Sequence, residues 1–193
     1  MDLGPVAVIA LIAGLAGGFV GAALVGTVEG MLRQRQPRAG SWTMAAAQTI
    51  SLRGLDPDSR KVVSLARQEA IQNGHSYVGS ENLAMALRLY STATLGRIWS
   101  DLAIDADALR RRIEATVPPI LGPTPVGTDF TPRISRIVAI ANTLAAEGKR
   151  GEVPPELLLL ALADEGGGTG ARALASLGAT AQRIREIVDG SPL

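Results

Sequence analysis

Apolar residues between positions 55 and 190 recur every three or four residues, which is the spacing of helices that bury one face. The first of these segments follows Asp56, a candidate N-cap, and has Pro57 at the first helical position, where its missing N–H does no harm. Ser80 is the candidate cap of the next segment, before the apolar run LAMAL. No alternating pattern of useful length indicates a strand. The pattern predicts four helices in each half of this region and an all-α fold.

The two halves are copies of each other at an offset of 75 residues, so that residue 55 corresponds to residue 130. Three stretches align without gaps at this offset: LDPDSRKVVSLARQEA with FTPRISRIVAIANTLA, VGSENLAMAL with VPPELLLLAL, and SDLAIDADALRRRI with ASLGATAQRIREIV. A single offset that holds across three stretches indicates a tandem duplication. We predict two four-helix bundles related by a pseudo-twofold axis, copy 1 at residues 55–118 and copy 2 at residues 130–190, with a linker at residues 119–129.

An uncharged apolar stretch precedes the repeats. Residues 3–28 carry no charged side chain, and about 20 apolar residues are enough for a helix to span a bilayer. A secretory signal peptide is the competing interpretation, but it would have a basic start, and this N-terminus carries Asp2 and no Lys or Arg. We predict one transmembrane helix, a retained anchor at residues 1–32, followed by a linker at residues 33–54 that contains Pro, Gly, Ser and Gln.

Basic residues just after the apolar stretch orient the predicted anchor. Arg33, Arg35 and Arg38 follow it closely, and the positive-inside rule keeps such a flank in the cytoplasm. We therefore expect a single-pass protein of the cell (inner or plasma) membrane, with its N-terminus outside and its C-terminal domain cytoplasmic.

Small residues form a stripe along the predicted anchor. Gly14, Gly18, Ala22 and Gly26 recur every fourth residue, a spacing that lets two helix backbones approach closely in lipid. Glycine is also simply frequent in membrane helices. The length of the stripe favours packing against a partner helix, without saying whether that partner is a second copy of the chain.

The composition supports a helical core and excludes several function classes. Hydrophobic residues make up 47% of the 193 residues and aromatic residues only 3%, which favours helices packed through Ala, Leu, Ile and Val over a sandwich or barrel. The formal net charge of +1 gives no argument for a nucleic-acid partner. The chain has no cysteine, which excludes disulfides, thiolate metal sites and cysteine nucleophiles.

The sequence contains no motif that would supply an enzyme or a cofactor site. It has no G-x-x-x-x-G-K-[ST] phosphate loop and no G-x-S-x-G elbow, and the run GGGTGA at residues 166–171 follows no predicted strand. His75 is the chain's one histidine, so a metal site would depend on scattered carboxylates. We predict that the protein is not an enzyme and binds no nucleotide, metal or other cofactor, and that His75 is a turn or capping residue.

The repeats resemble a known family, the Clp N-terminal repeat. FTPRISRIVAIA looks like its opening FTxRAxxVLxxA, HSYVGSENLAMAL looks like its HxYIGTEHLLLGL, and ALASLGATAQRIREIV looks like its closing LxxLGxxxxxVRxxI. In ClpA- and ClpC-type unfoldases this domain stands at the front of the protein and receives substrates and adaptors. Two departures stand out. Copy 2 has GEVPPELLLL in place of the aromatic, Ile and Gly-Thr loop, and the chain ends at Leu193, where the ATPase modules of the family would begin.

The resemblance also implies which residues a partner contacts. Some relatives recognise phosphoarginine, with an acidic residue of the GTEH turn on the guanidinium and the Thr that opens the first helix on the phosphate. These elements map to Glu81 and Glu156 and to Thr131, whereas copy 1 has Asp56 at the threonine position, where a carboxylate would repel a phosphate. Grouped by copy, the site is damaged in copy 1 and sits in an altered loop in copy 2. Both glutamates also have a simpler role that we favour, because acidic residues in a first turn stabilise a helix.

The anchor and the repeats together predict a membrane-anchored, non-enzymatic protein-binding module on the cytoplasmic face. It would receive or sequester substrates or adaptors of a Clp-type protease system, or bind the unfoldase itself. The expected docking surface is the groove between the repeats, flanked by Phe130, where exposed apolar residues would carry most of the binding energy. The alternative is an accessory structural subunit of a larger membrane protein complex, packed through the glycine stripe. We expect protein partners and a membrane, and no nucleic acid.

Overall fold

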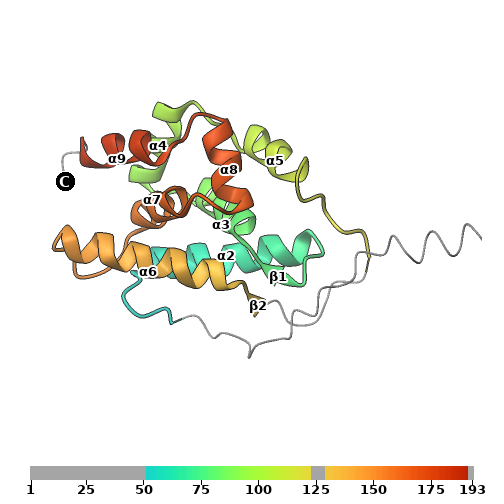
Figure 1. Cartoon of the computed structure of the whole chain (residues 1–193), viewed down its shortest axis with the longest axis horizontal. Helices are drawn as coiled ribbons and strands as arrows, with labels where there is room; N and C mark the ends of the chain where they lie inside the picture. Colours follow the sequence, from blue (N-terminus) through green and yellow to red (C-terminus); the bar gives the residue numbers. More distant parts are fainter. Residues whose placement is uncertain (1–50, 123–128, 191–193) are drawn as a thin grey trace, which may run out of the picture. The chain divides into compact units, whose positions relative to one another are not determined.

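The computed structural model describes residues 51–122 and 129–190, which form eight helices and two short strands (Figure 1). Copy 1 contains α2 (Pro57–Gln72), β1 (Tyr77–Val78), α3 (Ser80–Leu89), α4 (Ala93–Leu102) and α5 (Ala106–Glu114). Copy 2 contains β2 (Asp129–Phe130), α6 (Pro132–Glu147), α7 (Pro155–Glu165), α8 (Thr169–Ser176) and α9 (Ala181–Asp189). The four predicted helices of each copy are thus present.

The predicted anchor, with its glycine stripe, and the linker up to residue 50 lie outside the described residues. Within residues 51–122 and 129–190, no helix is long and apolar enough to cross a membrane.

Local signals place the start of α2 but not that of α3. The Asp56 Oδ1 atom accepts a hydrogen bond from the Ser59 N–H at 2.6 Å, and Pro57 is the first helical residue, as predicted. The prediction of Ser80 as a cap is wrong, because Gly79 is the N-cap of α3 and Ser80 is the first residue of the helix. Ser80 is needed elsewhere, as a contact between the two copies.

The central helices α3 and α7 are buried on nearly every side. Figure 1 shows them in the middle, with α2 and α6 on one side and α4, α5, α8 and α9 on the other. Every residue at positions 80–87 of α3 and 157–162 of α7 is buried. A helix that is apolar around its whole circumference is stable only inside a core, which explains the runs LAMAL and LLLLAL. Buried residues from both copies form one continuous core.

The fold is mostly helical rather than all-α, because short parallel strand pairs link the two copies. Residues Tyr77 and Val78 of β1 pair with Asp129 and Phe130 of β2, and an isolated bridge joins Leu55 to Val153. The 75-residue offset relates these two connections to each other, since it converts 78 into 153 and 55 into 130. In both cases, the segment before the first helix of one copy pairs with the segment before the second helix of the other copy. The two copies therefore exchange strands and do not form separate bundles.

Candidate functional site

The turn between α2 and β1 is the element that shapes the candidate site. Gly74 has a positive φ of 69°, and the following N–H, that of His75, donates to the Ala70 carbonyl at 2.9 Å. A side chain at position 74 would also strike the Ile120 carbonyl, since a Cβ there would lie 2.3 Å from that oxygen. Glycine is required for both reasons, and the turn it makes directs His75 inwards.

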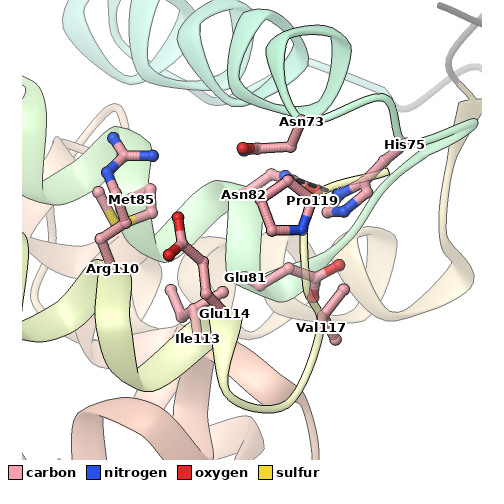
Figure 2. Close-up of a pocket in the computed structure, with 10 residues that line it drawn as sticks. All are labelled: Asn73, His75, Glu81, Asn82, Met85, Arg110, Ile113, Glu114, Val117 and Pro119. Atoms are coloured by element: carbon pink, nitrogen blue, oxygen red, sulfur yellow. Dashed lines mark hydrogen bonds between the residues drawn. The ribbon is translucent and has the colours of Figure 1, made fainter. Parts of the chain in front are cut away.

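His75 is a buried turn residue with one ring nitrogen unsatisfied. The residue is 2% exposed, its Nδ1 lies 3.4 Å from the Asn82 Nδ2, and its ring stacks on Tyr77 with centroids 5.6 Å apart. Its Nε2 is buried and has no hydrogen-bond partner among the described residues. Figure 2 shows His75 and Asn82 together at one side of a pocket that Pro119 also lines. The pocket volume is about 10 Å³, which is room for one water molecule.

Glu81 lies in the first turn of α3 and is only 5% exposed. Its carboxylate folds back over Gly79 so closely that a Cβ at position 79 would lie 2.1 Å from Oε1. The Ser80 hydroxyl donates to Oε2 at 3.4 Å, a long hydrogen bond. No basic side chain of the described residues lies within ion-pair distance of Glu81. Glu81 is therefore a buried carboxylate without a cation.

The charge of Glu81 acts on its neighbour Tyr77. Partial burial raises the pKa of the Tyr77 phenol, and the negative charge of Glu81 raises it further. Both effects disfavour the phenolate.

Thr131 lies beside the copy-1 turn, not beside the copy-2 turn. The strand register aligns Val78 with Phe130, and the next residue, Thr131, donates its N–H to the Val78 carbonyl at 3.0 Å. This places Thr131 opposite Gly79, over which the Glu81 carboxylate lies. The Thr131 Oγ1 is buried without a hydrogen-bond partner among the described residues and does not cap α6. The strand exchange thus brings the threonine of copy 2 to the glutamate of copy 1.

The corresponding position in copy 2 joins Asp56 to the Glu156 turn. The Asp56 N–H donates to the Val153 carbonyl at 3.1 Å, which mirrors the bond of Thr131. Glu156 lies in the first turn of α7 and forms an ion pair with Arg150, with 3.2 Å between Oε1 and Nη1. The grouping by copy placed Thr131 with Glu156, whereas the structure places Thr131 beside the turn before Glu81 and Asp56 beside the turn before Glu156.

Phe130 is half-buried at the junction of the copies. Its ring packs against the common core, and the Arg67 guanidinium carbon lies 4.8 Å from the ring centroid, the geometry of a cation–π contact. Its ring is covered on one face by Arg67, and its predicted role beside a docking groove stays a prediction.

An ion pair between a buried carboxylate and a partly exposed arginine, beside the same junction, was not found from the sequence. Glu165, 2% exposed at its side chain, binds Arg133, and Arg136 lies 3.8 Å away. Burial works to raise the pKa of the Glu165 carboxyl, but its hydrogen bond to Arg133 and the charge of that residue outweigh burial and hold the pKa below its usual value. The hydrogen bond to Glu165 raises the pKa of Arg133, and the charge of Glu81 raises it further, but the Arg133 guanidinium is hydrogen-bonded to Glu165 and not to Glu81. The two residues are 32 positions apart, and no local motif links them.

The described part of the chain contains no group of three His, Asp or Glu side chains arranged to hold a metal ion.

Comparison with known proteins identifies the family. The model of the Clp repeat (R) N-terminal domain matches residues 55–177 and again residues 129–191, and the chain belongs to this family. It carries a Clp-N domain, a protein-interaction module of Clp unfoldases.

Full-length relatives are much longer than this chain. The chloroplastic chaperone protein ClpC1 of Oryza sativa subsp. japonica is 33% identical over 125 residues, and the chloroplastic ClpC of Pisum sativum is 32% identical over the same length. Each match covers 65% of this chain and 14% of the relative. The chain thus matches only about a seventh of the length of these relatives.

Solved structures confirm the fold. The N-terminal domain of the chaperone ClpD from Arabidopsis thaliana has a TM-score of 0.59 at 15% identity, and the match covers 74% of this chain and 97% of that one. The Hsp104 N-terminal domain from Candida albicans has a TM-score of 0.57 at 16% identity, covering 72% and 93%. At this identity the likeness concerns the fold alone.

Proposed function

We propose that this protein is a membrane-tethered receptor of a Clp-type protease system. It binds substrates or adaptors of the unfoldase on the cytoplasmic face and does not itself process them. The Clp-N domain is the binding module, and residues 1–32 hold it at the membrane. Two features support this role, a group of buried polar atoms without partners and an exposed apolar patch beside it.

The observation that carries the proposal is the place of the two unsatisfied buried atoms. Among the described residues, the buried side-chain atoms without a hydrogen-bond partner are the His75 Nε2 and the Thr131 Oγ1. His75 precedes β1 and Thr131 follows β2, so they flank the strand pair next to Glu81. Buried polar groups are nearly always paired, and a buried carboxylate normally has a cation. A basic or phosphorylated side chain of a partner would complete this group, with Glu81 on the cation and Thr131 on the phosphate.

An apolar patch adjoins these polar groups. It consists of Ile71, Tyr77, Ile120 and Leu121, which are four of the six most exposed large hydrophobic residues described, and we call it the α2-end patch. Ile120 is 59% exposed and Leu121 97%. The Ile120 N–H donates to the Asn73 carbonyl at 2.8 Å, which holds this segment on the end of α2. Exposed apolar residues that cluster in this way are typical of protein-binding surfaces.

Tethering fits a receptor of modest affinity. A module held at the membrane meets partners of the same membrane at a raised effective concentration, so weak intrinsic binding is enough. The absence of a catalytic motif from the sequence agrees with a role in binding.

The test uses the full chain in detergent micelles and a permanently unfolded protein, fluorescently labelled and carboxymethylated α-lactalbumin. We expect the double change Ile120→Ser and Leu121→Ser to weaken binding by about tenfold or more, since exposed apolar anchors dominate such contacts. Leu89→Ser is the control, because Leu89 is also an exposed leucine, at 42%, but lies at the end of α3, outside the patch. Equal affinities for the double variant and the control would rule out the patch as the binding surface.

A second measurement separates a receptor from a fixed subunit. Partners that co-purify with the full chain are quantified by mass spectrometry, for the natural sequence and for a variant with Gly14, Gly18 and Gly26 changed to Leu. Diverse substoichiometric partners that survive the glycine changes support the receptor. A fixed one-to-one set of membrane proteins that is lost in the variant would instead make the protein a structural subunit held by its anchor.

A further inference from the structure

The turns that follow α2 and α6 have the same geometry and deliver equivalent side chains. Gly74 has φ 69° and Lys149 has φ 54°, and these two positions are 75 residues apart. The next residue donates its N–H to the carbonyl five positions earlier in both turns, His75 to Ala70 at 2.9 Å and Arg150 to Ala145 at 2.8 Å. His75 and Arg150 therefore occupy equivalent positions, each ahead of the glutamate of the following helix.

The two glutamates differ in what they bind. In copy 2, Arg150 reaches Glu156 with its guanidinium, and the pair is largely shielded, with side-chain exposures of 29% for Arg150 and 12% for Glu156. In copy 1 the same position holds His75, whose ring is turned to Asn82 instead. Glu81 is thus left without the cation that its counterpart has.

We infer that Arg150 is a resident ligand of Glu156, so that of the two equivalent glutamates only Glu81 is left without a cation from the described part of its own chain. The inference rests on the proposed function in one respect, namely that a glutamate at this position binds a basic side chain of a partner. The Arg150–Glu156 pair is an example of that contact within the chain itself. It makes a duplicated domain asymmetric, with one binding event for each chain.

An internal arginine excludes an external one for a simple physical reason. A group tethered a few residues away acts at an effective concentration of millimolar or above, so a weakly binding partner side chain at lower concentration does not displace it. The neighbouring Asp56 adds a second barrier for a phosphorylated partner. Its carboxylate stands at the start of α2 beside the Glu156 turn, where Thr131 stands beside the Glu81 turn.

The test replaces Arg150 with the residue that copy 1 has at this position, Arg150→His. Arg185→His is the matched control, because it also removes one arginine of an ion pair, that with Asp164 at 2.8 Å, at a distance from the turn. The probe is the peptide acetyl-Ala-Arg-Ala-amide, with its citrulline analogue as the uncharged comparison. Binding is followed on the labelled full chain in micelles by amide NMR shifts, read separately at residues 79–82 and 154–157, where only Glu156 and Leu157 carry amide protons because Pro154 and Pro155 have none. Thermal melting confirms that each variant is folded.

We expect the natural chain to respond at residues 79–82 alone, and the Arg150→His variant to respond at both segments, with an apparent affinity at 154–157 raised by about tenfold or more. Adding Glu156→Gln should abolish the new response and keep the first. If Arg150→His gains nothing at 154–157 while 79–82 responds, the resident-ligand inference is wrong and the receiving role of Glu81 stands. If only 154–157 responds in the variant and 79–82 never does, the role of Glu81 is wrong and the inference stands. No response at either segment in any variant would overturn both.

Discussion

The close approach of α8 to α3 makes Gly170 the glycine whose replacement we expect to be most disruptive. Gly170 is the second residue of α8 and is buried against the first turn of α3. A Cβ at this position would lie 2.1 Å from the Ser80 carbonyl oxygen and 2.6 Å from its carbon. These are backbone atoms, so the clash is relieved only if one helix moves. Because a carbon–oxygen contact needs about 3.3 Å, the shift is about 1 Å.

The expected cost of Gly170→Ala follows from this shift. Overpacking of this kind costs about 1–3 kcal/mol. The hydrogen bond from the Gly170 N–H to the Ser80 Oγ, now 3.2 Å, would be lost at about 1 kcal/mol more. The higher helix propensity of alanine offsets up to about 1 kcal/mol of this loss. We therefore expect the free energy of unfolding to fall by about 1–3 kcal/mol, a large part of the roughly 5–15 kcal/mol typical of a domain.

Urea unfolding of the full chain, followed by far-UV circular dichroism, measures this change. Gly96→Ala is the matched control, because Gly96 lies inside α4 and a Cβ there meets no atom within 4 Å. Propensity alone then applies, and the control should be more stable than the natural chain by up to about 1 kcal/mol. The reasoning is refuted if Gly170→Ala is as stable as Gly96→Ala, since the contact between the helices would then not be tight.

Three further predictions concern the turns and the titrating groups. Lys149→Gly should raise the unfolding free energy by up to about 1 kcal/mol in the same urea assay, because a side chain at φ 54° is strained; an unchanged midpoint would contradict this. Arg133 makes the pKa of Glu165 lower in the folded state than in the unfolded state. The stabilisation that Glu165 gives the folded state is therefore complete above its ordinary pKa and is lost as the pH falls through its folded pKa. The stability difference between the natural chain and Glu165→Gln should therefore shrink between pH 6 and pH 3, and a constant difference would argue against the pair. The Tyr77 phenol should titrate above its usual pKa of 10.0, and Glu81→Gln should lower that pKa only in part, since burial is the larger cause. ¹³C NMR of the tyrosine ring measures both pKa values, and an identical pKa in the variant would refute the influence of the Glu81 charge on Tyr77.

Helix positions and the duplication were predictable because their signals are local. Asp56 and Pro57 mark the start of α2 within two residues, and the apolar runs of α3 and α7 predict that these helices are buried. Each such signal depends on neighbours within a turn or two of helix. The 75-residue offset was also predictable, because it is found by aligning the sequence with itself.

The two-residue strands were not predictable in this way. β1 and β2 are too short to show an alternating pattern, and each exists only because the other copy supplies its partner. Ser80 illustrates the same limit: its type suggested a helix cap, but its hydroxyl accepts from the Gly170 N–H of the other copy.

The sequence by itself determined the helical repeats, the family resemblance and the residue types at the candidate site. Only the tertiary structure decided which of them lie together: Thr131 beside the turn of Glu81, Asp56 beside the turn of Glu156, and Arg150 with Glu156 itself. The physical reason is the strand exchange. Hydrogen bonds between segments far apart in the chain determine which residues of the two copies are neighbours. A pattern within one copy contains no information about which residues of the other copy it will contact.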